Sequence, residues 1–187
     1  MQRKAIYFGN TASVYGVGNK TKMSNIEKCY PQETDWTCSL ACLRTLLSGS
    51  RYTVPSEELL VQLLNKQPGP VSSNDLLKSK IFTLIDREDV QLAYDKPITY
   101  DYANELISLL ETHNVMIACT LNGGHWLSVL GYVSLGNIEE DQIILYDPYY
   151  HSTRVFRADE IFSMWTGSFP DSLDGDYIAI KRSDSKC

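Results

Sequence analysis

The stretch that decides the fold is "QETDWTCSLACLRTLL", residues 32–47, which leads from a polar loop into an apolar run. Its apolar positions recur at helical spacing, at Leu40, Leu43 and Leu47. Thr37 or Asp35 stands where a helix N-cap is expected, so the stretch predicts a helix that begins at Cys38. Unpaired N–H groups at a helix start stabilise a thiolate, which makes Cys38 a candidate nucleophile.

Cys38 and Cys42 lie one helical turn apart, but their positions favour different roles. By position alone, Cys38 fits a nucleophile and a buried structural cysteine equally well. Cys42 is one turn deeper, away from the terminal N–H groups, so a structural role is favoured. A zinc site with His125 and Asp147 is disfavoured, because zinc-binding cysteines usually occupy a knuckle rather than an apolar helix. A Cys38–Cys42 disulfide does not fit a regular helix. We therefore expect no metal and no other cofactor.

Composition limits the remaining function classes. The chain has 187 residues, enough for one domain with a sizeable core. A net charge of -6 gives no electrostatic footprint for nucleic acid. No apolar run approaches the roughly 18 residues of a membrane span, and the first residues lack the apolar core of a secretory signal. The odd count of five cysteines suits a reducing compartment. We expect a cytoplasmic protein, with delivery as an effector or leaderless secretion left open.

Helical patterns come first along the chain and strand patterns second. Residues 1–27 are polar and weakly patterned, and are interpreted as an N-terminal arm ahead of one domain at 28–187. Helices are expected at 38–47, 56–65, from about 73, at 101–113 and at 158–165. Strands are expected at "VMIACTL", "HWLSVLGYV", "QIILYD", "TRVFR" and "YIAIKR". This order predicts an α+β fold with N-terminal helices packed on a mostly antiparallel sheet.

A catalytic cysteine needs a base, and the chain contains three histidines. His113 ends a predicted helix, where the helix dipole favours a cation. His151 lies in a turn and is expected to be exposed. His125 follows Gly123 and Gly124 and opens an apolar strand, so its imidazole is expected to be accessible. His125 is therefore the candidate base.

Hairpin geometry supplies a partner for that base. Two predicted strands flank Gly136, and His125 and Asp147 lie 11 residues before and after it. Antiparallel pairing makes His125 and Asp147 cross-strand neighbours, within a register slip of a few residues. An aspartate before Pro148 is also common in a turn, and the pairing with His125 favours the functional role over that one.

Gln32 completes the candidate site. It lies six residues before Cys38, on the loop that enters the helix. Its side-chain amide, with the backbone N–H of Cys38, is positioned to donate to an oxyanion. A glutamine, a cysteine, a histidine and an aspartate in this order fit an acyl-transfer site.

Three segments carry a family resemblance that spans roughly residues 28 to 182. "YPQETDWTCSLACLRTLL" resembles the glutamine–cysteine segment of papain-like cysteine peptidases, and most closely that of the bacteriocin-processing (double-glycine) peptidase domains of bacterial ABC exporters. "GHWLSVLGYV" resembles their histidine strand. "IILYDPYYHSTRVFRADEIFSMWTG" resembles their stretch from Asp-Pro to a Trp-Thr-Gly end.

The resemblance implies a papain-like fold and a peptide or protein substrate. It also implies Cys38 as nucleophile, His125 as base, Asp147 as orienter and Gln32 in the oxyanion hole. The chain departs from the family's Asp-Cys-Gly at the nucleophile, where it reads Thr-Cys-Ser. No transporter segment follows, so a standalone domain is expected. Extra residues before the histidine strand are expected to form a helical border to the cleft.

The resulting hypothesis is a cysteine peptidase that binds its substrate in extended form. Candidate substrate-binding residues are Trp36, Ser39, Gly124 and Trp126, although the two tryptophans fit a core equally well. A deamidase, transpeptidase or other acyltransferase using the same thiol is an alternative, because one fold hosts several chemistries. A non-catalytic peptide-binding module on a peptidase scaffold is the second alternative.

Overall fold

The computed structural model describes residues 4–8, 12–16, 20–93, 102–119, 124–137, 139–165 and 175–183. Its helices are α1 (Cys38–Leu47), α2 (Glu57–Leu64), α3 (Ser73–Lys78), α4 (Tyr102–Thr112) and α5 (Ala158–Met164), with short 3-10 helices η1 (Ile81–Leu84) and η2 (Arg87–Asp89). Its strands are β1 (Lys4–Phe8), β2 (Ala12–Gly16), β3 (Lys20–Met23), β4 (Val90–Ala93), β5 (His113–Cys119), β6 (His125–Ser134), β7 (Gln142–Asp147), β8 (Ser152–Arg157) and β9 (Tyr177–Lys181).

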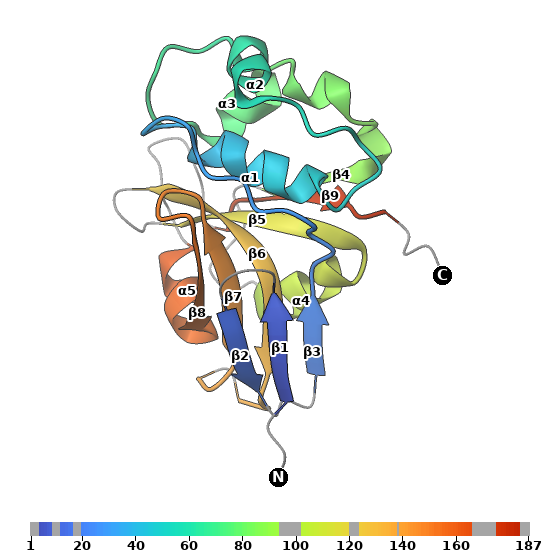
Figure 1. The fold of residues 1–187 in the computed structure, drawn as a ribbon, viewed down its shortest axis with the longest axis vertical. Coiled ribbons are helices and arrows are strands. Elements are labelled where there is room, and N and C mark those ends of the chain that lie inside the picture. Colours follow the sequence, from blue (N-terminus) through green and yellow to red (C-terminus); the bar gives the residue numbers. More distant parts are fainter. Residues whose placement is uncertain are drawn as a thin grey trace.

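The centre of the molecule is a seven-stranded antiparallel sheet in the order β4-β9-β5-β6-β7-β8. β3 is the seventh strand and pairs with the second half of β6, beyond the end of β5. β1 and β2 pair only with each other among the described strands. The predicted α+β fold with helices packed on an antiparallel sheet is confirmed (Figure 1).

Both faces of this sheet are covered by helices. In β5, Met116 and Ala118 belong to the core cluster formed with α1, α2 and α3. The alternate residues Val115 and Ile117 belong to a second cluster with α4 and α5. Figure 1 shows α1 to α3 on one side of the sheet, with α4 and α5 on the other. Burial on both faces explains why β5 is apolar along most of its length, without the usual alternation.

The N-terminal segment joins this sheet from residue 20 onward. Met23 pairs with Gly131 of β6, and a side chain at residue 131 would lie 2.5 Å from the Cε atom of Met23. Glycine at 131 therefore lets β3 approach. The backbone N–H of Asn25 then donates to Oδ1 of Asn114 at 2.9 Å. Part of the predicted arm thus lies on the domain's sheet, and the boundary near residue 27 stays a prediction.

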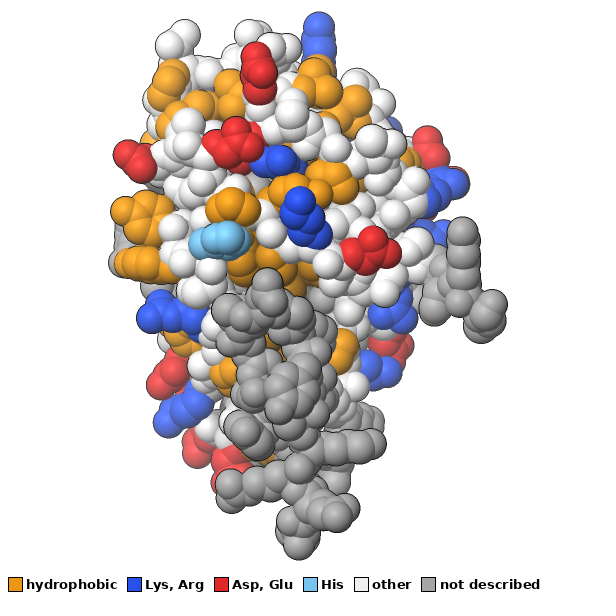
Figure 2. Space-filling view, in the orientation of Figure 1, with side chains coloured by type: hydrophobic (Ala, Val, Ile, Leu, Met, Phe, Trp, Pro, Cys, Tyr) orange, Lys and Arg blue, Asp and Glu red, His pale blue; other side chains and the backbone are white. Residues whose placement is uncertain are grey.

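The surface carries charges of both signs. On the face drawn in Figure 2, acidic and basic side chains alternate without a continuous tract of either. Within the described ranges, no helix is long and apolar enough to cross a membrane.

Candidate active site

Cys38 is the first residue of α1, as predicted. Thr37 occupies the N-cap position but makes no capping hydrogen bond with its side chain. Its Oγ1 instead donates to the carbonyl of Thr34 at 3.1 Å and accepts the Thr34 N–H at 3.2 Å. Thr37 is therefore the N-cap residue by position, as predicted, but its side chain does not bond to the helix. The N–H groups at the start of α1 remain available to an anion beside Cys38.

His125 and Asp147 meet across the β6–β7 hairpin. Ser128 pairs with Tyr146, which places residue 127 opposite Asp147 and leaves His125 one diagonal step away on the same face. Val133 pairs with Gln142, so the offset from simple symmetry about Gly136 already exists at the turn, and a bulge between Val129 and Gly131 reduces this offset by one residue. Nε2 of His125 lies 2.7 Å from Oδ1 of Asp147. The predicted proximity of these two side chains is confirmed.

Asp147 also stabilises the turn that follows β7, which is the other role considered for an aspartate before Pro148. Its Oδ1 accepts the backbone N–H of Tyr149 at 3.0 Å and that of Tyr150 at 3.5 Å. Both roles are thus combined in one carboxylate: it holds the turn after β7 and contacts the imidazole of His125. Since the turn fixes Asp147, the orientation of His125 depends on this turn as well.

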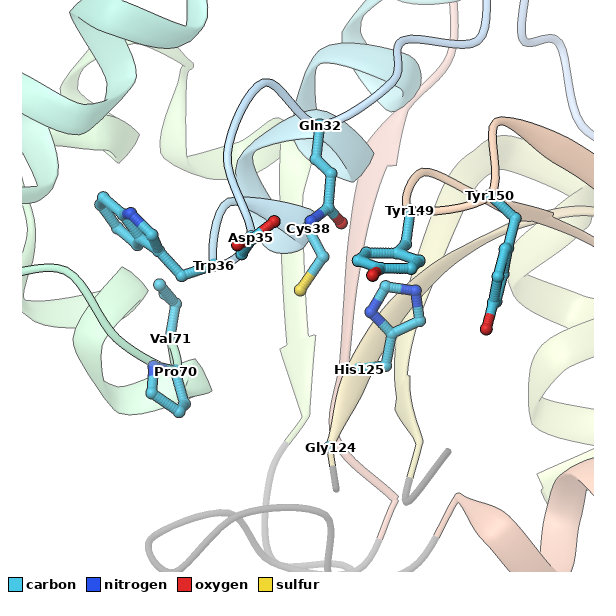
Figure 3. Close-up of a pocket in the computed structure, with 10 residues that line it drawn as sticks. All are labelled: Gln32, Asp35, Trp36, Cys38, Pro70, Val71, Gly124, His125, Tyr149 and Tyr150. Carbon is cyan, nitrogen blue, oxygen red and sulfur yellow. The ribbon is translucent and has the colours of Figure 1, made fainter. Parts of the chain in front are cut away.

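Charges in the site stabilise a protonated histidine. Burial alone would lower the pKa of His125, but Asp147 and the Cys38 side chain raise it from 6.5 to about 9. Burial alone would raise the pKa of Asp147, but its hydrogen bonds from His125, Tyr149 and Tyr150 lower it below its ordinary value. With Nε2 of His125 on Asp147, Nδ1 is the nitrogen available to Cys38 (Figure 3).

Cys42 has a different environment from Cys38. It is fully buried, and its Sγ donates to the carbonyl of Trp126 at 3.3 Å. Burial raises the pKa of Cys42 well above its ordinary value, so this thiol stays protonated. The predicted structural role of Cys42 fits this environment. In the part of the chain that the structure describes, no group of three His, Cys, Asp or Glu residues forms a metal site.

Gln32 extends over Cys38 in Figure 3. Its Nε2 donates one hydrogen bond, to the carbonyl of Thr34 at 2.7 Å. A primary amide has two N–H groups, so a second remains for an oxyanion. The backbone N–H of Gln32 donates to the carbonyl of Pro148 at 3.1 Å, the residue after Asp147. The Gln32 loop and the Asp147 turn are therefore directly connected.

Cys38 and His125 open into a cleft of about 420 Å³. Its lining residues are Gln32, Asp35, Trp36, Cys38, Pro70, Val71, Gly124, His125, Tyr149 and Tyr150 (Figure 3). The extra segment before the histidine strand borders the cleft through Pro70 and Val71, which lie in the loop between α2 and α3 rather than in the expected helix. Gly124 has φ +107°, a backbone conformation that favours glycine at the start of the His125 strand.

Two of the predicted substrate-binding residues lie elsewhere. Trp126 is fully buried, and its Nε1 donates to the carbonyl of Val71 at 2.9 Å. Ser39 is also fully buried, and its Oγ has no hydrogen-bond partner among the described residues. Neither lines the cleft, so the assignment of both to direct substrate contact is corrected. Trp126 instead supports the wall that Val71 forms, because alternation along β6 turns it toward the α1 core.

The sequence analysis missed four lining residues and assigned Asp35 only a capping role. Tyr149 and Tyr150 are 56% and 53% exposed beside the cleft, in a T-shaped pair with centroids 5.0 Å apart. Their position directly after Asp147-Pro148 is a signal that was available in the sequence. Pro70 and Val71 carried no such signal, because a long-range contact brings them to the site.

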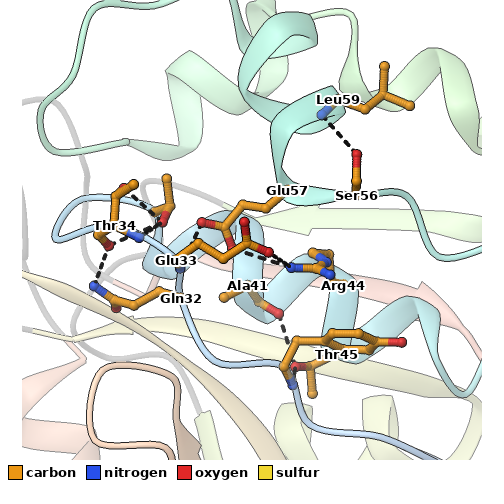
Figure 4. Close-up of polar contacts among 11 residues, drawn as sticks. Gln32, Glu33, Thr34, Ala41, Arg44, Thr45, Ser56, Glu57 and Leu59 are labelled. Carbon is orange, nitrogen blue, oxygen red and sulfur yellow. Dashed lines mark hydrogen bonds and ion pairs between the residues drawn. The ribbon is translucent and has the colours of Figure 1, made fainter.

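The loop that carries Gln32 is held by a hydrogen bond to a buried carboxylate (Figure 4). Glu57, in the first turn of α2, is 1% exposed, and its Oε1 accepts the backbone N–H of Glu33 at 2.9 Å. Nη1 of Arg44 lies 2.8 Å from Oε1 of Glu33 and 3.5 Å from Oε2 of Glu57. The guanidinium of Arg44 also lies over the ring of Tyr30, with Cζ 4.5 Å from the ring centroid. Helices α1 and α2 are thereby joined to the loop that carries Gln32.

Removing Glu57 is expected to destabilise the fold. Glu57→Ala leaves the partly buried N–H of Glu33 without its acceptor and Arg44 without one partner, and is expected to lower the free energy of unfolding in urea by about 3 kcal/mol. Glu57→Gln is expected to cost less, since its amide oxygen still accepts the Glu33 N–H. The control is Glu58→Ala, an exposed carboxylate in the same turn, which should change stability by under about 0.5 kcal/mol. Equal losses in Glu57→Ala and Glu58→Ala would contradict the assignment.

Stability should depend on pH through His125. The folded chain binds this proton more tightly than the unfolded chain, so the gain is complete below about pH 6.5 and lost as pH rises through about 9. The full pKa difference corresponds to about 3 kcal/mol. Asp147 acts oppositely, and its contribution is lost only as pH falls through its lowered pKa. Urea unfolding from pH 6 to 10 tests this, and the decline should be absent in His125→Gln.

Comparison with known proteins identifies the fold. No protein family model matches this chain. No curated protein sequence matches it either. Among solved structures, the chain is similar to UfSP from C. elegans, with 18% sequence identity and a TM-score of 0.58. The similarity covers 91% of this chain and 35% of that chain, so the chain spans about a third of its length. The chain therefore shares the α+β fold of UfSP, and the resemblance to papain-like and bacteriocin-processing peptidases stays a prediction.

Proposed function

We propose that this chain is a thiol peptidase in which Cys38, His125 and Asp147 form a catalytic triad. The observation that carries the proposal is the 2.7 Å contact from Nε2 of His125 to Oδ1 of Asp147, with Nδ1 at the opposite edge of the ring directed toward the sulfur of Cys38. A nucleophile, a base in reach of it, and a third group that orients the base are the parts of nucleophilic catalysis. The resemblance to papain-like cysteine peptidases supports the same chemistry.

In the proposed reaction, the Cys38 thiolate attacks the carbonyl carbon of a peptide bond. The backbone N–H of Cys38 and the second amide N–H of Gln32 stabilise the oxyanion. The C–N bond breaks as Nδ1 of His125 gives its proton to the leaving amine, and a thioester remains on Cys38. His125 then takes a proton from water, whose oxygen attacks the thioester and releases the acid and the thiolate.

Asp147 has a distinct part in this scheme. It keeps Nε2 of His125 occupied, so the nitrogen facing Cys38 is always Nδ1. It also favours the imidazolium that pairs with a thiolate, in line with the raised pKa of His125. The same carboxylate fixes the turn at Tyr149 and Tyr150, which form one side of the cleft.

The same thiol and base also fit other reactions that pass through a thioester. A deamidase or a transpeptidase forms the same thioester and differs only in its substrate amide or in the group that attacks the acyl-enzyme. A non-catalytic binding module would use the cleft alone. The retained nucleophile, base and orienter favour an enzyme over that module.

Product analysis tests the proposal. Wild-type protein and Cys38→Ala are incubated with a peptide library in water labelled with ¹⁸O, and products are read by mass spectrometry. A peptidase yields new N-termini and one ¹⁸O in each new C-terminus, only with Cys38 present. Release of ammonia with an intact backbone would replace the proposal with a deamidase, and joined peptides would replace it with a transferase. Equal products from both proteins would end it.

A further inference from the structure

We propose that the cleft binds a peptide through a lysine or arginine side chain close to the reacting bond, with Asp35 as its counter-charge. This inference rests on the proposed function and adds a substrate class to it. The four other ionisable lining residues are Cys38, His125, Tyr149 and Tyr150. When Cys38 and His125 form an ion pair, their charges cancel. The remaining charge among the lining side chains is then the negative charge of Asp35.

Asp35 is available for such a contact. It is exposed, and its carboxylate makes no hydrogen bond or ion pair with any residue in the described part of the chain. Figure 3 shows it on the same wall as Cys38, between Trp36 and Gln32. No lysine or arginine is among the residues described as lining the cleft. An unneutralised carboxylate therefore faces the space where substrate would lie.

Two basic residues on neighbouring segments have acidic partners, and a third, Arg154, lies over the ring of Tyr150 with its guanidinium carbon 5.5 Å from the ring centroid. Arg44 pairs with Glu33 and Glu57 behind the Gln32 loop. On the opposite border, Lys66 pairs with Asp75 and donates to the carbonyl of Pro70 at 2.6 Å. A positive charge for Asp35 is thus most readily supplied by the bound substrate.

The surfaces beside Asp35 suit the rest of a basic side chain. Trp36, Pro70 and Val71 lie on one side of Asp35 in Figure 3, and the exposed ring of Tyr149 lies on the other. A lysine or arginine stem packs well on such apolar atoms while its charged end stays in water. Aromatic faces also attract the cation itself.

Electrostatics in the proposed reaction gives a second reason. Negative charge develops on the substrate oxygen beside Cys38, and a carboxylate on the same wall repels it. A substrate cation next to Asp35 removes this repulsion, whereas a substrate carboxylate adds to it. The preference should therefore appear in kcat/KM as well as in binding.

Matched peptides test the proposal. Each set is identical except for one position, scanned along the peptide, which carries Lys, Gln or Glu. At one position we expect wild type to show about tenfold higher kcat/KM for Lys than for Glu, from one partly exposed ion pair with an aromatic contact. Asp35→Asn should lose most of this ratio and Asp35→Lys should reverse it. Glu58→Gln removes one exposed charge outside the cleft and should keep the ratio. A ratio unchanged in Asp35→Asn, or absent in wild type, would overturn the inference.

A binding measurement separates this inference from the proposed function. The same peptides, carrying a fluorophore, are titrated with Cys38→Ala, and anisotropy is recorded at low and high salt. The subsite is supported, even if wild type cleaves nothing, when Cys38→Ala binds the Lys peptide more tightly than the Glu peptide. High salt and the added Asp35→Asn substitution should each weaken this binding. Cleavage without any charge preference would reject the subsite and leave the peptidase standing. Neither cleavage nor charge preference would reject both.

Discussion

Replacing Cys38 with alanine is expected to abolish peptide turnover, with a fall of about ten-thousand-fold or more in kcat. Without the sulfur no thioester forms, and the oxyanion donors and His125 have no nucleophile to assist. The fold should persist, because the change removes one atom from a side chain that is only just buried, at 9% exposed. Turnover of a fluorogenic peptide, with the unfolding midpoint of both proteins, measures the effect.

Cys29 provides the matched control for this prediction. It is half-buried outside the cleft, and burial raises its pKa to about 11. Cys29→Ala should therefore retain turnover, and Cys29 should react slowly with iodoacetamide near neutral pH. Cys38 should react much faster, and mass mapping of the adducts distinguishes the two sites. Equal labelling of both cysteines would contradict an activated thiol at Cys38.

Replacing Asp147 with asparagine is expected to lower kcat by about a hundred- to ten-thousand-fold. An amide is neutral and can donate to Nε2 of His125, which favours the wrong tautomer of the imidazole. Oδ1 of Asp147 contacts both His125 and the Tyr149 N–H, so an amide NH₂ in its place also removes the turn contact. An amide oxygen in its place keeps the turn and gives His125 a neutral partner, and kcat falls in either case. Loss of the carboxylate should also bring the pKa of His125 down from about 9. A pH–rate profile should then lose activity at a lower pH on its alkaline side than wild type does.

Asp141 is the control for this second prediction. It is a buried aspartate at the other end of the same hairpin, where it accepts the hydroxyl of Tyr132 at 2.5 Å and the N–H of Leu135 at 2.5 Å. Asp141→Asn should reduce stability while kcat and the pH–rate profile stay close to wild type. If both variants lower kcat equally, Asp147 has only a structural role.

The features that could be predicted from sequence depend on local contacts. Helix α1 follows from its apolar spacing, and α2 begins after Ser56, whose side chain accepts the N–H of Leu59 as an N-cap should. The approach of His125 to Asp147 was also predictable, because a hairpin joins residues only 22 apart and its register follows from the turn. Such patterns need no knowledge of the rest of the chain.

His113 shows where local reasoning failed. The sequence predicted a cation at the end of a helix, but His113 begins β5 and is 6% exposed. Burial lowers its pKa, and the nearby Lys181 lowers it further, so the imidazole is neutral. The carbonyl of Leu110, at the end of α4, is instead met by Nη1 of Arg182 at 3.2 Å. That partner lies far along the chain and leaves no local pattern.

β3 and β4 were missed for a related reason. Each has four residues and pairs with a distant strand, β3 with β6 and β4 with β9. Strand preference depends strongly on neighbouring strands, so a short segment with exposed positions has little signal of its own. Sheet pairing supplied by the rest of the fold determines both strands.

The sequence by itself determined the α+β order, the helix that begins at Cys38 and the hairpin that joins His125 to Asp147. Spacing along a helix or across one turn is enough to specify each of these. Only the tertiary structure decided that Trp126 and Ser39 are buried, that Pro70 and Val71 wall the cleft, and that Glu57 holds the Gln32 loop. These contacts join segments far apart in sequence, and burial depends on what packs against a side chain rather than on its own identity.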